Sequence, residues 1–237
     1  RGGEARARAH EARDRRRAVT AAAKEARLRV TEIFLSLQGE AAMVGFPTVF
    51  VRLTGCPLRC RYCDTAYAFH GGEWWPEEGI LRKVAAFGVR HVCVTGGEPL
   101  AQRACLPLLV ALCDKGYEVS LETSGALPIA AVDARVQRVV DVKTPGSGES
   151  QRNRYGDLAL LTSRDLVKFV ITDRNDYEWS LACLHEHDLA ARCTVLFSPS
   201  YGQMPARELA DWILADRAPV RFQIQLHKIL WGDEPGR

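Results

Sequence analysis

The stretch GCPLRCRYCDT, residues 55–65, places three cysteines within eight positions, and thiols at this spacing can hold a metal group. Thiolates are soft ligands that suit zinc or iron–sulfur clusters. A closed site of either kind normally takes four ligands, and no second cysteine or histidine pair stands nearby. Cys56, Cys60 and Cys63 can instead wrap three corners of a [4Fe–4S] cube and leave one iron open. We expect that open iron to be the reactive position.

Two alternatives for the triad stay open from the residues alone. His70 stands near enough to act as a fourth ligand of a zinc site, and an electron-transfer cluster would need a fourth cysteine to close it. The remaining cysteines stand in apolar contexts typical of buried small hydrophobic residues; they are Cys93, Cys105, Cys113, Cys183 and Cys193. Because no secretory signal is visible, we expect a reduced, cytoplasmic protein.

A second polar stretch, TGGEP at residues 95–99, connects a strand-like run to a helix-like one. Glycine permits close approach of the backbone to a ligand, and Pro99 suits the first turn of a helix. The stretch is a weak signal alone, because such turns are common before helices. Together with the cysteine triad after the preceding strand, it favours a cofactor site.

The elements that position these motifs alternate along the chain. Apolar, β-branched runs predict buried parallel strands at residues 48–53, 90–95, 118–123, 138–143, 166–171, 193–198 and 221–226, after a short strand that begins at Val30. Helical periodicity predicts helices at residues 77–87, 100–115, 176–187 and 205–216. This order predicts an α/β fold, an incomplete, TIM-like parallel β/α barrel, because the chain is too short for eight units.

Polar and glycine-rich residues recur directly after the predicted strands. The cysteine loop follows the strand at 48–53, TGGEP the next, and ETSG the one after; DVKTPGSGE, SPSYGQ and LHK close three later strands. Because the carboxyl ends of parallel strands meet at one face, we expect these loops to surround a single ligand site.

Charge and composition indicate one domain, which we assign to residues 30–237. Hydrophobic residues make up 47% of the 237, and no apolar run approaches the roughly 18 residues that span a bilayer. Residues 1–29 hold ten Lys/Arg against four Asp/Glu, whereas the rest carries a net charge of −3. We expect this basic extension to be disordered, and we expect neither a nucleic-acid nor a membrane partner.

The pairing of CxxxCxxC with TGGEP resembles the signature of the radical S-adenosylmethionine (SAM) superfamily. The resemblance implies a [4Fe–4S] cluster on Cys56, Cys60 and Cys63, whose free iron is chelated by the amino and carboxylate groups of SAM. The backbone around Gly97 would approach the methionyl amine. In that superfamily one electron from the cluster cleaves SAM and yields a 5′-deoxyadenosyl radical.

Within the superfamily, the stretches EIFLSLQGE, GFPTVFVRLTGC, CDT and QLHK resemble the 7-carboxy-7-deazaguanine synthase family across residues 31–230. The resemblance implies a lyase that converts 6-carboxy-5,6,7,8-tetrahydropterin to 7-carboxy-7-deazaguanine with loss of ammonia, on the route to queuosine and other 7-deazapurines. The radical would remove hydrogen from C6 of the pterin, and a hydrogen would return from 5′-deoxyadenosine. It also implies Mg²⁺ as a cofactor, a reductase or flavodoxin-type electron donor and a homodimer.

The same resemblance implies a role for each site residue. The expected substrate contacts are Leu37, Gln38, Gly39, Arg52 and Thr95, and the forked guanidinium of Arg52 would pair with the substrate carboxylate. The hydroxyl of Thr65 would bind Mg²⁺, which keeps several waters. The expected SAM contacts are Gly97, Asp141, Val142, Lys143, Ser198, Pro199, Ser200 and Tyr201.

Two positions depart from the family's pattern. Ala41 stands where the family commonly has the second glycine of LQGEG, and DVK at residues 141–143 stands where many members have SPK. Single residues also have plain structural explanations: a surface ion pair for Arg52, turn residues for Gln38 and Glu40, a helix N-cap for Thr65, a solvated strand end for Lys143 and a structural histidine for His227.

Two rival functions share parts of this pattern. A glycyl-radical activase has CxxxCxxC but acts on a protein, and it would not require the SLQGE loop or Arg52. A non-catalytic iron–sulfur or zinc-binding module would use the cysteines alone.

Overall fold

The computed structural model describes residues 27–232, 234 and 236, and one nine-stranded sheet runs through them in the order β3-β1-β2-β4-β5-β6-β7-β8-β9. The strands are β1 Arg27–Leu37, β2 Pro47–Leu53, β3 Glu73–Pro76, β4 His91–Gly96, β5 Glu118–Thr123, β6 Gln137–Asp141, β7 Leu166–Ile171, β8 Thr194–Pro199 and β9 Arg221–Phe222. From β2 through β9 neighbouring strands are parallel, whereas β1 is antiparallel to both β2 and β3.

The sheet is open, because its end strands β3 and β9 are not paired with each other. The predicted fold class, an incomplete parallel barrel, is therefore confirmed. The last predicted strand is shorter than expected, since only Arg221–Phe222 pairs with β8. The following residues turn away because Gln223 and Leu226 bond the loop after β1: the Leu226 amide donates to the Gly39 carbonyl at 3.0 Å.

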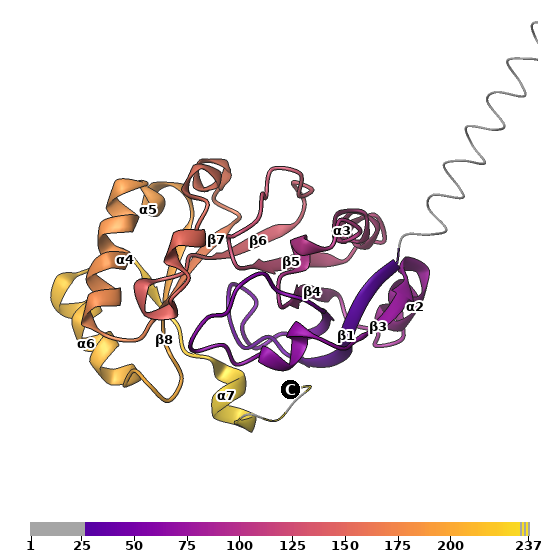
Figure 1. The fold of residues 1–237 in the computed structure, drawn as a ribbon, viewed down its shortest axis with the longest axis horizontal. Helices are drawn as coiled ribbons and strands as arrows, with labels where there is room; N and C mark the ends of the chain where they lie inside the picture. The colour runs from indigo at the N-terminus through magenta and orange to yellow at the C-terminus, as the bar shows by residue number, and fades with distance from the viewer. Residues whose placement is uncertain (1–26, 233, 235, 237) are drawn as a thin grey trace, which may run out of the picture.

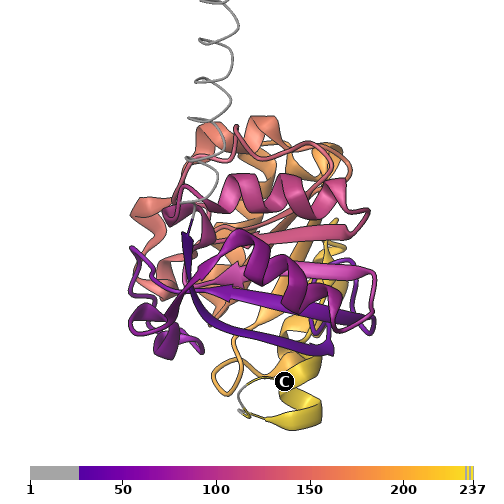
Figure 2. The ribbon, with the colours of Figure 1, turned by 90° about the vertical axis from the view of Figure 1, so that its right-hand side faces the viewer.

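Helices cover the outer face of this sheet. They are α2 Glu77–Ala85, α3 Cys105–Asp114, α4 Arg174–Glu186, α5 Leu189–Arg192 and α6 Ala206–Asp216, while α7 Leu226–Trp231 lies near the chain end on the opposite, inner side (Figure 1). Figure 2 shows the same curved sheet from its β1 edge, with α7 below it. The four predicted helices are present, although α3 starts later than expected. Its predicted first turn is interrupted because the Gln102 amide donates to the carbonyls of Arg29 and Thr54.

Strand alternation separates the hydrophobic core from the site. In β7, Val167, Phe169 and Ile171 are fully buried in the main core, whereas the intervening Lys168 and Val170 line a cavity. This is the period-two pattern of a strand with one apolar and one functional face. The outer helices complete the core; α3 contributes three fully buried leucines, Leu108, Leu109 and Leu112.

The first strand begins at Arg27, three residues earlier than the predicted domain start at Val30. Leu28 is fully buried and pairs with Trp75 of β3, so burial against an unpredicted neighbour extends the strand. The first 26 residues of the expected disordered extension lie outside the described residues. In the part of the chain that the structure describes, no helix is long and apolar enough to cross a membrane.

Candidate functional site

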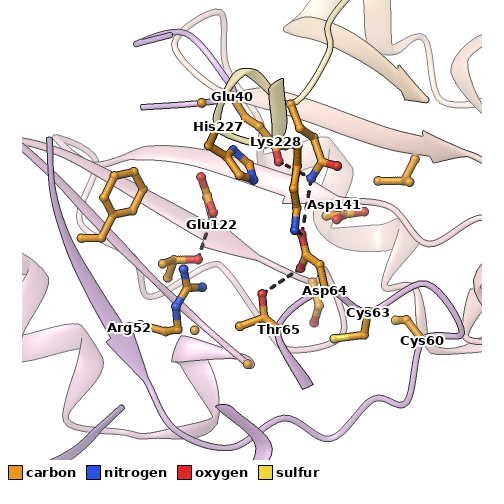
Figure 3. Close-up of a pocket in the computed structure, with 18 of the residues that line it drawn as sticks. Glu40, Arg52, Cys60, Cys63, Asp64, Thr65, Glu122, Asp141, His227 and Lys228 are labelled. Carbon is orange, nitrogen blue, oxygen red and sulfur yellow. Dashed lines mark hydrogen bonds and ion pairs between the residues drawn. The ribbon is translucent and has the colours of Figure 1, made fainter. Parts of the chain in front are cut away.

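A cavity of about 640 Å³ opens on the inner face of the sheet, at the carboxyl ends of the parallel strands. The loops after β2, β4, β5 and β8 border it together with α7. Figure 3 shows Arg52 at one end and Cys60 and Cys63 at the other, with Thr65 between them. The sequence-based expectation that these loops share one site is thus met by the geometry, as the parallel arrangement dictates.

One end of the cavity is a thiol wall, made of Cys56, Cys60 and Cys63 together with Tyr62 and Lys143. All three thiols are free and half-buried. Burial raises the pKa of each thiol, that of Cys60 to about 11, although Lys143 opposes the shift. Thiols with such pKa values are protonated at neutral pH, so metal binding here must displace their protons.

The thiol wall offers three soft ligands to a metal group. Among the described residues, no group of three or more His, Cys, Asp and Glu side chains is gathered closely enough to hold one metal ion. The three cysteines nevertheless face one cavity, and soft thiolates suit iron–sulfur clusters. We therefore consider these residues suited to three corners of a [4Fe–4S] cluster.

Gly97 shapes the floor next to the thiol wall. A Cβ atom placed on Gly97 would lie 2.4 Å from the Gly55 carbonyl oxygen and 2.8 Å from Cβ of Cys56. Only glycine therefore lets the loop after β4 pack against the cysteine loop. The Glu98 amide adds a hydrogen bond of 2.8 Å to the same Gly55 carbonyl.

The Glu98 side chain ties two loops of the site together. It is fully buried, and its carboxylate accepts hydrogen bonds from the Thr123 hydroxyl, the Ser124 hydroxyl and amide, and the Leu100 amide. A buried carboxylate satisfied by several donors is a rigid link between the loops after β4 and β5. Its position in TGGEP is now explained by this link, which the sequence did not reveal.

Two polar atoms at the thiol wall have no hydrogen-bond partner within the described chain. They are Oδ1 of Asp141 and the hydroxyl of Tyr62, and both are buried while their residues line the cavity. The other oxygen of Asp141 lies 2.8 Å from Nζ of Lys143. Unsatisfied buried polar atoms are costly, so a polar ligand that complements them fits here.

The other end of the cavity is a charged wall, made of Gln38, Glu40, Arg52, Glu122 and Lys168. Thr95 donates to Glu122 Oε2 at 2.9 Å, and Gln38 lies at the limit of hydrogen bonding from Oε1, at 3.5 Å.

Arg52 stands at the edge of the charged wall and contacts Glu32 behind it, with 2.7 Å between Nε and Oε1. Burial alone lowers the pKa of Arg52, but Tyr67 and Glu32 outweigh it, so the net shift is upward. Its side chain is only 15% exposed, which excludes a solvated surface ion pair.

Lys168 joins the two walls. Its Nζ lies 2.6 Å from Oε2 of Glu40 and 3.7 Å from Oδ2 of Asp141. Burial disfavours both charges, but the attraction and hydrogen bond between Glu40 and Lys168 outweigh it. The pKa of Glu40 is therefore lowered, and that of Lys168 is raised well above its usual value. Gln225 completes the network by donating to Glu40 Oε1 at 2.9 Å.

Thr65 lies between the walls, and its hydroxyl donates to Asp64 Oδ1 at 2.8 Å. Thr65 also precedes the 3₁₀ turn Ala66–Phe69, but its side chain makes no capping hydrogen bond, so the N-cap explanation does not account for it. Burial alone raises the pKa of Asp64, but Thr65 and Lys228 outweigh it and lower the pKa. Figure 3 shows Lys228 reaching Asp64 from α7, with 3.9 Å between Nζ and Oδ2.

The loop after β1 depends on close contact with α7. A Cβ on Gly39 would lie 2.2 Å from Nδ1 of His227, so only glycine fits beside the imidazole. Ala41, in the same loop, has a φ of +63°, the left-handed conformation that favours glycine. Gln223 holds it there, since Gln223 Oε1 accepts from the Ala41 amide at 2.6 Å and Nε2 donates to its carbonyl at 3.0 Å.

Most predicted site residues line the cavity, namely Leu37, Gln38, Gly39, Arg52, Cys56, Cys60, Cys63, Thr65, Thr95, Gly97, Asp141, Lys143, Ser200 and Tyr201. Val142, Ser198 and Pro199 do not line it; all three are buried next to it. Sequence reasoning gave no role to Lys168, Gln225 or Lys228, although the stretch QLHK contains the last two. The one signal for Lys168 was a lysine within the apolar run LVKFVI.

Comparisons with known proteins agree with this geometry. The radical SAM superfamily matches at residues 50–143. The chain is 43% identical over 213 residues to the 7-carboxy-7-deazaguanine synthase of Chlorobaculum tepidum, covering 89% of this chain and 97% of that protein. It is 41% identical over 224 residues to the enzyme of the same name from Koribacter versatilis, covering 87% and 98%.

Among solved structures, the crystal structure of QueE from Escherichia coli matches with a TM-score of 0.69 at 25% identity, covering 86% of this chain and 96% of that one. The two relatives named 7-carboxy-7-deazaguanine synthase, at 43% and 41% identity, are matched over nearly their whole length. The chain therefore belongs to the 7-carboxy-7-deazaguanine synthase family of the radical SAM superfamily.

Proposed function

We propose that this chain converts 6-carboxy-5,6,7,8-tetrahydropterin to 7-carboxy-7-deazaguanine with loss of ammonia. The observation that carries the proposal is a single cavity with three thiols at one end and a buried arginine at the other. The relatives named 7-carboxy-7-deazaguanine synthase support the same reaction. The route served by the product is the biosynthesis of queuosine and other 7-deazapurines.

At the thiol wall, Cys56, Cys60 and Cys63 hold a [4Fe–4S] cluster beside SAM. When bound, these two groups supply the one-electron chemistry that removes a hydrogen atom from the substrate. Asp141 offers its unpartnered oxygen to a donor group of SAM, and Gly97 keeps the backbone close. The remaining contacts of SAM are Val142, Lys143 and the loop residues 198–201.

At the charged wall, the pterin lies with its carboxylate on Arg52 and its ring edge against Leu37, Gln38 and Gly39. A guanidinium suits a carboxylate because it presents parallel donors. Glu122, held by the Thr95 hydroxyl, accepts from a ring N–H of the pterin. These side chains orient the substrate and exclude water from the reacting carbon.

Mg²⁺ is the third cofactor, and Thr65 is its ligand from the protein. The Thr65 hydroxyl keeps lone pairs for a cation while it donates its proton to Asp64. The other ligands would be waters and substrate oxygens, as Mg²⁺ prefers. When bound, the ion would supply electrostatic stabilisation for negative charge on the substrate.

We further propose that the protein works in the cytoplasm as a homodimer and takes its electron from a reductase or a flavodoxin-type donor. Its eight cysteines are free thiols, which is the state that a reducing compartment maintains.

One anaerobic assay tests the proposed reaction. Protein with a reconstituted cluster receives SAM, reductant, Mg²⁺ and 6-carboxytetrahydropterin, and mass spectrometry follows the products. We expect 7-carboxy-7-deazaguanine from the wild type and none from Cys56→Ala. Formation of 5′-deoxyadenosine without that product would overturn the substrate and leave the radical chemistry standing.

A further inference from the structure

We propose that Glu32 and Tyr67 form a clamp that fixes the guanidinium of Arg52 through its Nε and directs its two terminal nitrogens at the ligand carboxylate. Glu32 lies behind Arg52, outside the cavity lining, whereas Tyr67 lines the cavity beside Arg52. This inference rests on the proposed function, because it assumes that Arg52 binds a carboxylate. It makes Glu32 and Tyr67 positioning residues that determine selectivity for carboxylated pterins.

Regular antiparallel pairing brings Glu32 and Arg52 together. Glu32 stands directly opposite Arg52, in the same register as the pairs that follow it along β1 and β2. Directly opposite residues of an antiparallel pair point to the same face of the sheet, so the acid and the base share one face. The ladder shifts register just before this pair, at Thr31, whose hydroxyl is hydrogen-bonded to the Thr54 hydroxyl at 2.7 Å.

The contacts of Glu32 converge on one oxygen. Oε1 accepts from Nε of Arg52 at 2.7 Å and from the Tyr67 hydroxyl at 2.8 Å. The guanidinium also lies 5.8 Å from the ring centroids of both Phe34 and Tyr67. Contacts from three sides restrict the rotation of the arginine side chain.

The free end of Arg52 is the part that a ligand can use. Within the described residues, the guanidinium of Arg52 donates a hydrogen bond through Nε, to Glu32, and its two terminal nitrogens make no hydrogen bond or ion pair. A carboxylate that approaches must therefore take these two nitrogens together, which is a bidentate geometry. The negative charge of Glu32 also balances Arg52 before a ligand arrives.

Tyr67 is the donor in its contact with Glu32. A carboxylate oxygen accepts, so the Tyr67 hydroxyl donates to Oε1 of Glu32 across 2.8 Å and holds Glu32 toward Arg52. Tyr67 is half-exposed, so its removal should not disturb the core.

The test compares two ligands on protein that carries its cluster, SAM and Mg²⁺ but receives no reductant. Calorimetry measures the dissociation constants of 6-carboxytetrahydropterin and of tetrahydropterin, which lacks the carboxylate. The dissociation constant of tetrahydropterin divided by that of 6-carboxytetrahydropterin is the selectivity ratio, which isolates carboxylate recognition from general effects on the cavity. Glu32→Ala should lower the wild-type ratio by about tenfold, and Tyr67→Phe by about threefold. Glu32→Gln keeps the acceptor oxygen and should stay within about threefold of the wild type.

Glu118→Ala is the matched control, because Glu118 makes a similar 2.8 Å ion pair with Arg90 at the opposite ends of the strands. It should leave the ratio unchanged. A ratio for Glu32→Ala and Tyr67→Phe equal to that of the wild type would overturn the clamp. A wild-type ratio near one would instead overturn carboxylate binding by Arg52 and thus the proposed function itself. Melting curves check that each variant is folded. If Glu32→Ala does not fold, the ratio measured for Tyr67→Phe decides whether the clamp exists.

Discussion

The two walls of the cavity differ in how far the protein completes them by itself. At the charged wall, Arg52 is already bonded to Glu32, and Lys168 to Glu40, at 2.7 and 2.6 Å. At the thiol wall, the cysteines are free thiols with raised pKa values, and Oδ1 of Asp141 and the Tyr62 hydroxyl have no hydrogen-bond partner among the described residues.

This difference separates preorganisation from assembly. The charged wall presents fixed donors and acceptors, which is the arrangement that orients a substrate without reorganisation cost. The thiol wall reaches low energy only when bound groups replace the protons and satisfy the orphaned oxygens. Substitutions should therefore damage the two walls in different ways, and the predictions below use that contrast.

The largest effect on stability is expected for Lys168→Met. Among the described residues, the substitution leaves Glu40 with no cation at hydrogen-bond distance and removes one of the two lysines paired with Asp141. Breaking a buried ion pair from one side typically costs about 3 to 5 kcal/mol of unfolding free energy. Urea unfolding of the protein measures this cost.

Lys143→Met is the matched control at the thiol wall. Asp141 then keeps Lys168, and its unpartnered oxygen already awaits a ligand, so the loss should be smaller. Equal losses from the two variants would contradict the claim that the charged wall is the preassembled one.

A smaller effect is expected in the pH dependence of stability. The pKa of Glu40 is lowered in the folded state, where burial opposes the charge but Lys168 and Gln225 outweigh burial. A lowered folded-state pKa adds stability above the ordinary value of 4.5, and this stability is lost as the pH falls through the folded-state value. Glu40→Gln should thus flatten the decline of unfolding free energy below pH 4.5.

Asp64 and Asp165 also have lowered pKa values, so the Glu40→Gln variant should keep part of the slope. Chemical denaturation between about pH 3 and 6 gives the comparison. The exposed Glu78→Gln serves as a control that follows the wild type. A slope for Glu40→Gln as steep as that of the wild type would argue against its charged pairing.

The smallest effect is expected for Ala41→Gly. Relief of the left-handed strain favours glycine, while loss of a methyl group packed among Val139, Leu166 and Leu196 opposes it, so stability should change by less than about 1 kcal/mol.

Gly39→Ala in the same loop should be far more harmful, because its Cβ would collide with His227. Thermal melting of both variants tests this; similar losses would mean that α7 does not confine the loop.

Short-range patterns made the thiol wall predictable. Cys56, Cys60 and Cys63 are close in sequence, so any fold keeps them together, and the apolar strand runs fixed which loops meet at one end of the sheet. The same argument placed Arg52 and Thr95, which are directly paired in β2 and β4, side by side.

Long-range contacts made the charged wall harder to predict. Glu32 and Tyr67 are 35 positions apart, and Glu32 meets Arg52 through the register in which β1 pairs with β2. Lys168 and Glu40 are 128 positions apart. Residues 223–226 were mistaken for the end of a strand, and α7 was not predicted, because contacts with the loop after β1, and not composition, decide where these residues go. Tertiary contacts override local preference at each of these points.

The most direct test of the central claim is the chemistry of the group that completes the thiol wall. Anaerobically reconstituted protein is analysed for iron, sulfide and zinc, and its reduced form is examined by electron paramagnetic resonance with and without SAM. We predict about four irons and four sulfides per chain and a spectrum that changes when SAM is added, since one iron is open. Bound zinc, or a cluster spectrum that SAM leaves unchanged, would contradict an open iron held by Cys56, Cys60 and Cys63.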